Sequence, residues 1–121
     1  MRMAFSEILK KVVEESDKGL GAAIVASDGI VVEEYKIEKN LDLYVLGAEF
    51  CKTFKEFRDK TEFLKKGAPL EFTVQMESSI LIFKKINEDY FLVLVLDAEG
   101  NFGKGRFVIR REMDQLKDEF N

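Results

Sequence analysis

The stretch Gly21-Ala22-Ala23-Ile24-Val25-Ala26-Ser27-Asp28-Gly29-Ile30-Val31 decides the fold of this protein. Residues 21–26 are small and apolar, which is typical of a strand covered on both faces. The pair Asp28-Gly29 tolerates positive φ angles, and residues 30–35 resume a strand pattern. The stretch therefore predicts a β-hairpin, the strongest local signal in the chain.

Amphipathic helices are predicted on both sides of this hairpin. Upstream, apolar side chains recur at helical spacing over residues 4–16, and Gly19 and Gly21 end that helix. Downstream, residues 43–66 contain no proline and are followed by Gly67. At 100° per residue, one apolar stripe of this second helix comprises Leu43, Leu46, Gly47, Phe50, Phe54, Phe57, Thr61 and Leu64. We expect this stripe to face the core.

Three strands and a closing helix follow Pro69, whose ring cannot continue a helix. The extended runs cover residues 70–77, 79–85 and 90–97, with links short enough for antiparallel neighbours. Asn101 is the expected N-cap of a helix over residues 102–119. The apolar anchors expected for this helix are Phe107, Met113, Leu116 and Phe120.

The apolar pattern of each strand indicates its position in the sheet. Residues 21–26, 80–83 and 90–96 are almost continuously apolar and should be central, whereas residues 70–77 alternate and the second strand ends in Glu33-Glu34-Tyr35-Lys36. The sequence therefore predicts an α/β (α+β) fold in the order αββαβββα, as one domain over residues 1–121. Its five-stranded antiparallel sheet has the order 2-1-5-4-3, with the long helix on one face and the two terminal helices on the other.

Composition excludes several functions. The net charge of -4 offers no general attraction to nucleic acid, and no apolar run approaches the length that inserts into a membrane. The chain start lacks a signal-peptide pattern and there is one cysteine, so a cytoplasmic location is expected. Without histidine there is no imidazole base and no ordinary catalytic zinc site. We expect no enzyme activity, no catalytic residues, no metal and no cofactor.

The residues 21–31 quoted above resemble the first hairpin of Roadblock/dynein light chain domains, including MglB-like Roadblock domains. Asn101-Phe102-Gly103 is similar to the Asn-Leu-Gly that starts the last helix of that family. The resemblance spans nearly the whole chain and implies a three-layer, Roadblock/profilin-like sandwich. The middle helix departs from the family because bulky Phe50, Phe54 and Phe57 stand where small residues are common.

The resemblance also implies a homodimer or Roadblock-family heterodimer in which the third strands of two copies pair and the middle helices lie side by side. A physical argument points the same way, because an edge strand without internal proline, lysine or arginine leaves unpaired backbone groups that soluble proteins usually cover. The expected dimer contacts are Phe72, Thr73, Val74 and Gln75 on the strand, with Tyr44, Ala48 and Cys51 on the helix.

Many Roadblock domains bind small Ras-like GTPases, so the resemblance implies a regulatory partner for such a GTPase. The docking candidates are Val45, Lys52, Lys55, Arg58 and Phe63, on or just after the middle helix. One alternative is a scaffold or adaptor of a motor or polarity complex that leaves nucleotide hydrolysis unchanged. Another is a sensor that holds a small molecule between helix and sheet.

Overall fold

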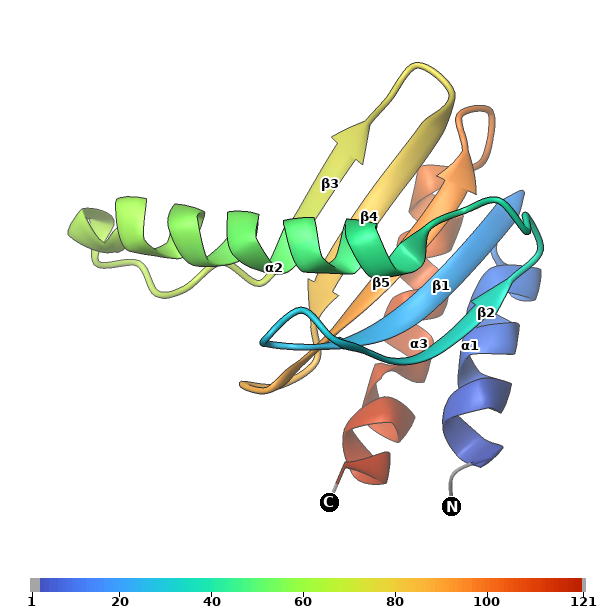
Figure 1. Cartoon of the computed structure of the whole chain (residues 1–121), viewed down its shortest axis with the longest axis horizontal. Coiled ribbons are helices and arrows are strands. Elements are labelled where there is room, and N and C mark those ends of the chain that lie inside the picture. The colour runs from blue at the N-terminus through green and yellow to red at the C-terminus, as the bar shows by residue number, and fades with distance from the viewer. Residues whose placement is uncertain (1–2, 121) are drawn as a thin grey trace.

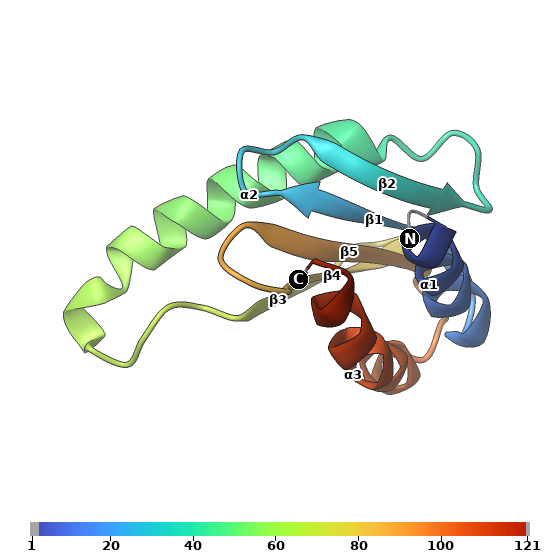
Figure 2. The same ribbon diagram turned by 90° about the horizontal axis from the view of Figure 1, so that it is seen from below.

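The structure, a computed structural model, describes residues 3–120. Its elements are α1 (Met3–Glu15), β1 (Gly19–Ala26), β2 (Val31–Lys36), α2 (Leu43–Lys60), the 3-10 helix η1 (Glu62–Leu64), β3 (Glu71–Gln75), β4 (Ser79–Lys85), β5 (Tyr90–Asp97) and α3 (Phe102–Glu119). The strands form one antiparallel sheet in the order β2-β1-β5-β4-β3 (Figure 1). Figure 2 shows α2 on one face of the sheet and α1 and α3 on the other. The predicted fold class and strand order are confirmed.

The β1–β2 hairpin forms at the predicted turn. The Gly29 N–H donates to the Ala26 carbonyl at 2.8 Å, and the Ile30 N–H donates to the Asp28 carboxylate at 3.1 Å. Gly29 has a φ of 93°, a conformation that side chains with a Cβ rarely adopt. A Cβ there would also lie 3.2 Å from the Cα of Ala48 on α2. Glycine therefore allows both the turn and the close approach of α2.

Side-chain caps start the two long helices. The Asp42 carboxylate accepts from the Val45 N–H at 3.1 Å and caps α2, and the Asn101 side chain accepts from the Lys104 N–H at 2.9 Å and caps α3. Each cap satisfies one backbone donor that the first helical turn leaves without a partner. The prediction that Asn101 is an N-cap is confirmed.

The sheet separates two apolar cores, because successive strand residues point to opposite faces. Ile24, Leu94 and Ile82 face the core under α1 and α3, while Val25, Val93 and Phe83 face the core under α2. Phenylalanine dominates the second core, in which the Phe54 ring lies 4.8 Å from Phe91 and 6.1 Å from Phe72. The two cores hold α1 and α3 against one face of the sheet and α2 against the other.

The middle helix is shorter than predicted, since α2 ends at Lys60 rather than at residue 66. The N–H and the hydroxyl of Thr61 both donate to the carbonyl of Phe57, at 3.0 and 2.9 Å, and the hydroxyl also lies 3.3 Å from the carbonyl of Arg58 at the helix end. The following 3-10 turn ends at Lys65, which has a φ of 52°. In both views this end of α2 projects beyond β3, so no strand lies beneath it (Figures 1 and 2).

Three residues that were predicted to face the core, Phe57, Leu64 and Phe107, are instead exposed. Phe57 is 47% exposed and Leu64 52% exposed, because they lie at the projecting end of α2 and beyond it. Phe107 is 61% exposed, because it lies opposite the α3 face that buries Ile109 and Met113. The third strand is also shorter than predicted and spans five residues.

No helix in the part of the chain that the structure describes has the length and apolar character needed to cross a bilayer.

Candidate functional site

One side of β3 has no strand partner in the sheet. The Leu70 carbonyl accepts from the Lys85 N–H at 2.9 Å, and the Met76 N–H donates to the Ser79 carbonyl at 2.8 Å. Because hydrogen-bonded pairs alternate in an antiparallel ladder, Phe72 and Val74 direct their backbone groups towards β4. The backbone groups of Glu71, Thr73 and Gln75 therefore point outward along the free edge.

Exposed apolar side chains lie beside this edge on the α2 face of the sheet. Val74 is 37% exposed and Met76 48% exposed, and both share the strand face of Phe72. The Phe72 ring packs edge-on against Phe57, with the centroids 5.4 Å apart. We call Phe57, Val74 and Met76 the β3–α2 patch. The alternation in the sequence predicted which face of the strand is apolar. Of these strand residues α2 covers mainly Phe72, so Val74 and Met76 remain exposed.

Two of the three predicted helix contacts, Ala48 and Cys51, lie next to the β1–β2 turn. Ala48 packs against Gly29, and the Cys51 thiol donates to the Ala26 carbonyl at 3.5 Å. Tyr44 lies at a similar angle on the helix and is exposed. Residues of α2 that approach β3, such as Phe57, occupy the opposite flank. Ala48 and Cys51 therefore lie beside the β1–β2 turn rather than beside β3, and the expectation that Tyr44, Ala48 and Cys51 contact the middle helix of a second copy stays a prediction.

Cys51 is also a core residue rather than a surface residue. Its side chain is 3% exposed and packs in the same core as Phe50 and Phe54. Burial raises the pKa of the Cys51 thiol, with the nearby Lys55 acting in the opposite direction. The thiol is therefore held in its neutral form and covered by the protomer itself.

The docking candidates occupy three separate places. Val45 and Lys52 lie on the outer surface of α2, away from the sheet, and Phe63 lies at the projecting end with 77% of its surface exposed. Lys55 and Arg58 instead line a cleft where α2 passes the β1–β2 and β4–β5 turns. Of the five docking candidates, the structure therefore brings Lys55 and Arg58 together in one cleft.

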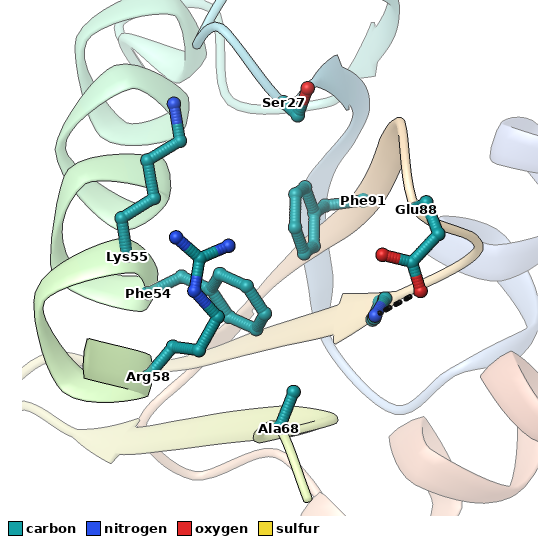
Figure 3. A pocket seen from close by; sticks show the side chains of 8 residues that line it. Ser27, Phe54, Lys55, Arg58, Ala68, Glu88 and Phe91 are labelled. Carbon is teal, nitrogen blue, oxygen red and sulfur yellow. Dashed lines mark hydrogen bonds and ion pairs between the residues drawn. The ribbon is translucent and has the colours of Figure 1, made fainter. Parts of the chain in front are cut away.

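The cleft has a volume of about 130 Å³ and an aromatic floor formed by Phe54 and Phe91 (Figure 3). Figure 3 shows Lys55 and Arg58 extending from α2, with Ser27 and Glu88 on the opposite side. The full lining is Ser27, Phe54, Lys55, Arg58, Ala68, Lys85, Glu88 and Phe91.

Three of the charged groups around the cleft are basic, and one of these is already neutralised. The Lys85 ammonium lies 2.8 Å from the Glu88 carboxylate, and this hydrogen bond lowers the pKa of Glu88. The Nε of Arg58 lies 3.4 Å from the exposed carboxylate of Asp59, a surface pair of small energy. Lys55 and the terminal nitrogens of Arg58 can therefore receive a carboxylate from outside the chain.

Sequence reasoning missed five residues of the cleft, namely Ser27, Ala68, Lys85, Glu88 and Phe91. They belong to segments far apart in the chain, and only the packing of α2 against two turns brings them to one place. No local pattern in the sequence could have indicated this meeting.

Neither the cleft nor the edge has the donors of a metal site. Across residues 3–120, no three His, Cys, Asp or Glu side chains cluster so as to hold a metal ion. What the region offers is a free sheet edge, an apolar patch and a small basic cleft, which are features for contact with another protein.

The chain is similar to several solved structures. It shares 34% sequence identity with MglC from Myxococcus xanthus over 97% of this chain and 99% of that chain, with a TM-score of 0.68. A structure of MglB with a tetrameric arrangement has 21% identity, covers 97% of this chain and 87% of its own, and has a TM-score of 0.87. The Roadblock/LC7 domain from Streptomyces avermitilis has 12% identity, coverages of 94% and 95%, and a TM-score of 0.84. No protein-family profile and no curated protein matches the chain.

The chain belongs to the Roadblock/LC7 family, on the basis of its 34% identity to MglC over 97% of the chain and of the shared fold. The resemblance read from the hairpin and from Asn101-Phe102-Gly103 is thereby confirmed. This similarity supports a regulatory or adaptor module.

Proposed function

We propose that this protein is a dimeric module that binds a small Ras-like GTPase and regulates it. The observation that carries the proposal is the free edge of β3 beside the open β3–α2 patch. Unpaired edges of this kind are usually covered in soluble proteins, and a second copy covers both the edge and the patch.

The geometry of the proposed dimer follows from where α2 crosses the edge. Within one protomer α2 passes over Phe72, near the start of β3. Antiparallel pairing of two β3 strands places the start of one strand beside the end of the other. The partner's α2 then lies over Val74 and Met76, so the exposed part of the patch becomes buried. A stable pair of this kind buries about 800 Å² per protomer.

Residue roles in the dimer differ from those expected from sequence in two respects. Phe72, Thr73, Val74 and Gln75 remain the proposed strand contacts, and Phe57 and Met76 join them. Cys51 is not proposed as a contact, because it is buried in the core, whereas the exposed Tyr44 and Ala48 remain proposed contacts between the middle helices.

The outer surface of α2 and the basic cleft form the proposed GTPase-docking face. Val45, Lys52 and Phe63 supply exposed apolar and basic contacts, and Lys55 and Arg58 receive a carboxylate of the GTPase. The Roadblock resemblance supports the choice of client, and the open cleft supports the position. Buried charge-assisted contacts of this type set orientation as well as affinity.

The test uses a small Ras-like GTPase encoded beside this protein, loaded with GDP or with a GTP analogue. Binding is measured by calorimetry and GTP hydrolysis by single-turnover kinetics. We expect nucleotide-dependent binding and a changed hydrolysis rate, with Lys55→Glu/Arg58→Glu weakening binding by about tenfold or more. Lys10→Glu on α1, an exposed lysine on the other face of the sheet, is the matched control and should bind normally.

Two results would contradict the proposal. Absence of binding in both nucleotide states would remove the GTPase as the client. Binding with an unchanged hydrolysis rate would instead favour the scaffold function.

A further inference from the structure

A second groove lies on the opposite face of the sheet from α2, between α3 and the end of β4 (Figure 2 shows the two faces). Its volume is about 410 Å³. Its apolar lining residues are Leu70, which is 61% exposed, and Ile86 and Met113, which are largely buried in the core beneath it. The remaining lining residues are Lys84, Lys85, Asn87, Glu88, Arg110 and Lys117.

The groove is positively charged although the chain as a whole is acidic. Four basic side chains line it against the single carboxylate of Glu88, whereas the net charge of the chain is -4. Lys85 is paired with Glu88 at 2.8 Å, and Lys84 lies 3.5 Å from Glu71, which also binds Arg106 at 2.8 Å. None of the ion pairs within the described chain involves Arg110 or Lys117. Two exposed cations therefore remain without an acidic partner there.

The spacing of these two cations defines the shape of the complementary ligand. Arg110 and Lys117 are seven residues apart on α3, or about 10.5 Å along the helix axis, and Met113 lies between them on the same face. A second helix that lies along α3 has its own residues i and i+7 at the same separation. Carboxylates at positions i and i+7 of that helix would pair with Arg110 and Lys117. Apolar residues at its positions i+3 and i+4 would contact Met113 and Leu70.

We propose that this groove binds an acidic amphipathic helix of a partner protein. The apolar floor and the concave shape favour a helix that buries side chains over a flat anionic surface. An extended anionic surface such as a membrane or a nucleic acid would also meet Asp114 and Asp118, which are exposed on the neighbouring face of α3, whereas a single helix in the groove needs to meet only Arg110 and Lys117. The proposed GTPase-docking residues Lys55 and Arg58 belong to α2 on the other face of the sheet, and the cleft and the groove share only Lys85 and Glu88.

The test uses the full chain and a fluorescent, terminally blocked helical peptide with Glu at positions i and i+7 and Leu at i+3 and i+4. Binding is followed by fluorescence anisotropy at two salt concentrations. We expect saturable binding that weakens with salt, and a dissociation constant raised about tenfold or more by Arg110→Glu/Lys117→Glu. Both residues are exposed, so the double variant should fold, which circular dichroism verifies.

Three controls distinguish binding in this groove from binding in the cleft beside α2 and from attraction by charge alone. Lys55→Glu/Arg58→Glu should leave peptide binding unchanged, and Arg110→Glu/Lys117→Glu should leave GTPase binding unchanged, so each proposal can fail without the other. A peptide with Ser in place of both Leu residues should bind at least several-fold more weakly if the apolar floor contributes.

Absence of saturable binding, or equal binding by the Arg110→Glu/Lys117→Glu variant, would overturn the proposal. It would also be overturned if vesicles containing phosphatidylserine bound the wild-type chain through these two residues while the peptide did not.

Discussion

Replacing Thr73 with proline tests the proposed pairing of β3 strands most directly. The Thr73 N–H points outward from the sheet, so proline removes no hydrogen bond within the protomer. In a two-fold dimer the same N–H would donate to the partner strand, and symmetry makes this two hydrogen bonds per dimer. At about 1 kcal/mol for each bond, the loss is about 2 kcal/mol, or roughly a 30-fold weaker dimer.

Sedimentation equilibrium over a dilution series measures this change. The wild-type chain should sediment at twice the protomer mass of 13.9 kDa, and Thr73→Pro should shift to the protomer mass at higher concentrations than wild type. Thr73→Val is the matched control, because it changes the side chain but keeps the N–H, and it should remain dimeric. Circular dichroism should show that all three proteins are folded.

Either of two outcomes would refute the reasoning. One is a Thr73→Pro protein whose dissociation constant equals that of wild type, since the edge N–H would then play no part in assembly. The other is a wild-type chain that stays at 13.9 kDa throughout the series.

Three further predictions concern the core, a helix cap and the buried thiol. Phe54→Ala should destabilise the protomer by about 3–5 kcal/mol in urea unfolding, because Phe54 is buried among Phe72, Phe83 and Phe91; a loss below about 1 kcal/mol would contradict this packing. Asn101→Ala should cost about 1 kcal/mol in the same assay through loss of the α3 cap, while Asn101→Asp should retain most of the stability. Iodoacetamide should modify Cys51 much more slowly in the native protein than in urea, as mass spectrometry would show. Because burial raises its folded pKa, the thiol should also cause stability to fall as pH rises above the unfolded value of about 8.5, and Cys51→Ala should remove this fall.

The candidate site was predictable only in part. The alternation over residues 70–77 indicated that this strand is an edge and showed which face is apolar, and both features are present. The helical angles placed Tyr44, Ala48 and Cys51 away from the core stripe, but Cys51 is buried, and an angle on an isolated helix does not say which part of the sheet each residue meets. That depends on the direction in which α2 crosses the sheet, which Ala48 against Gly29 and Phe57 against Phe72 reveal.

By itself, the sequence determined the order of the elements, the β1–β2 turn, the Asn101 cap and the order of the strands. These features follow from interactions between residues close in the chain and from apolar periodicity, and both are visible in the linear sequence. Only the tertiary structure decided where α2 extends beyond the sheet, that Phe57 and Leu64 are exposed, and which side chains line the cleft beside α2 and the groove beside α3. Those properties depend on contacts between residues far apart in the chain, such as Ser27, Arg58 and Glu88. These three residues come together only because α2 packs on the sheet beside two of its turns.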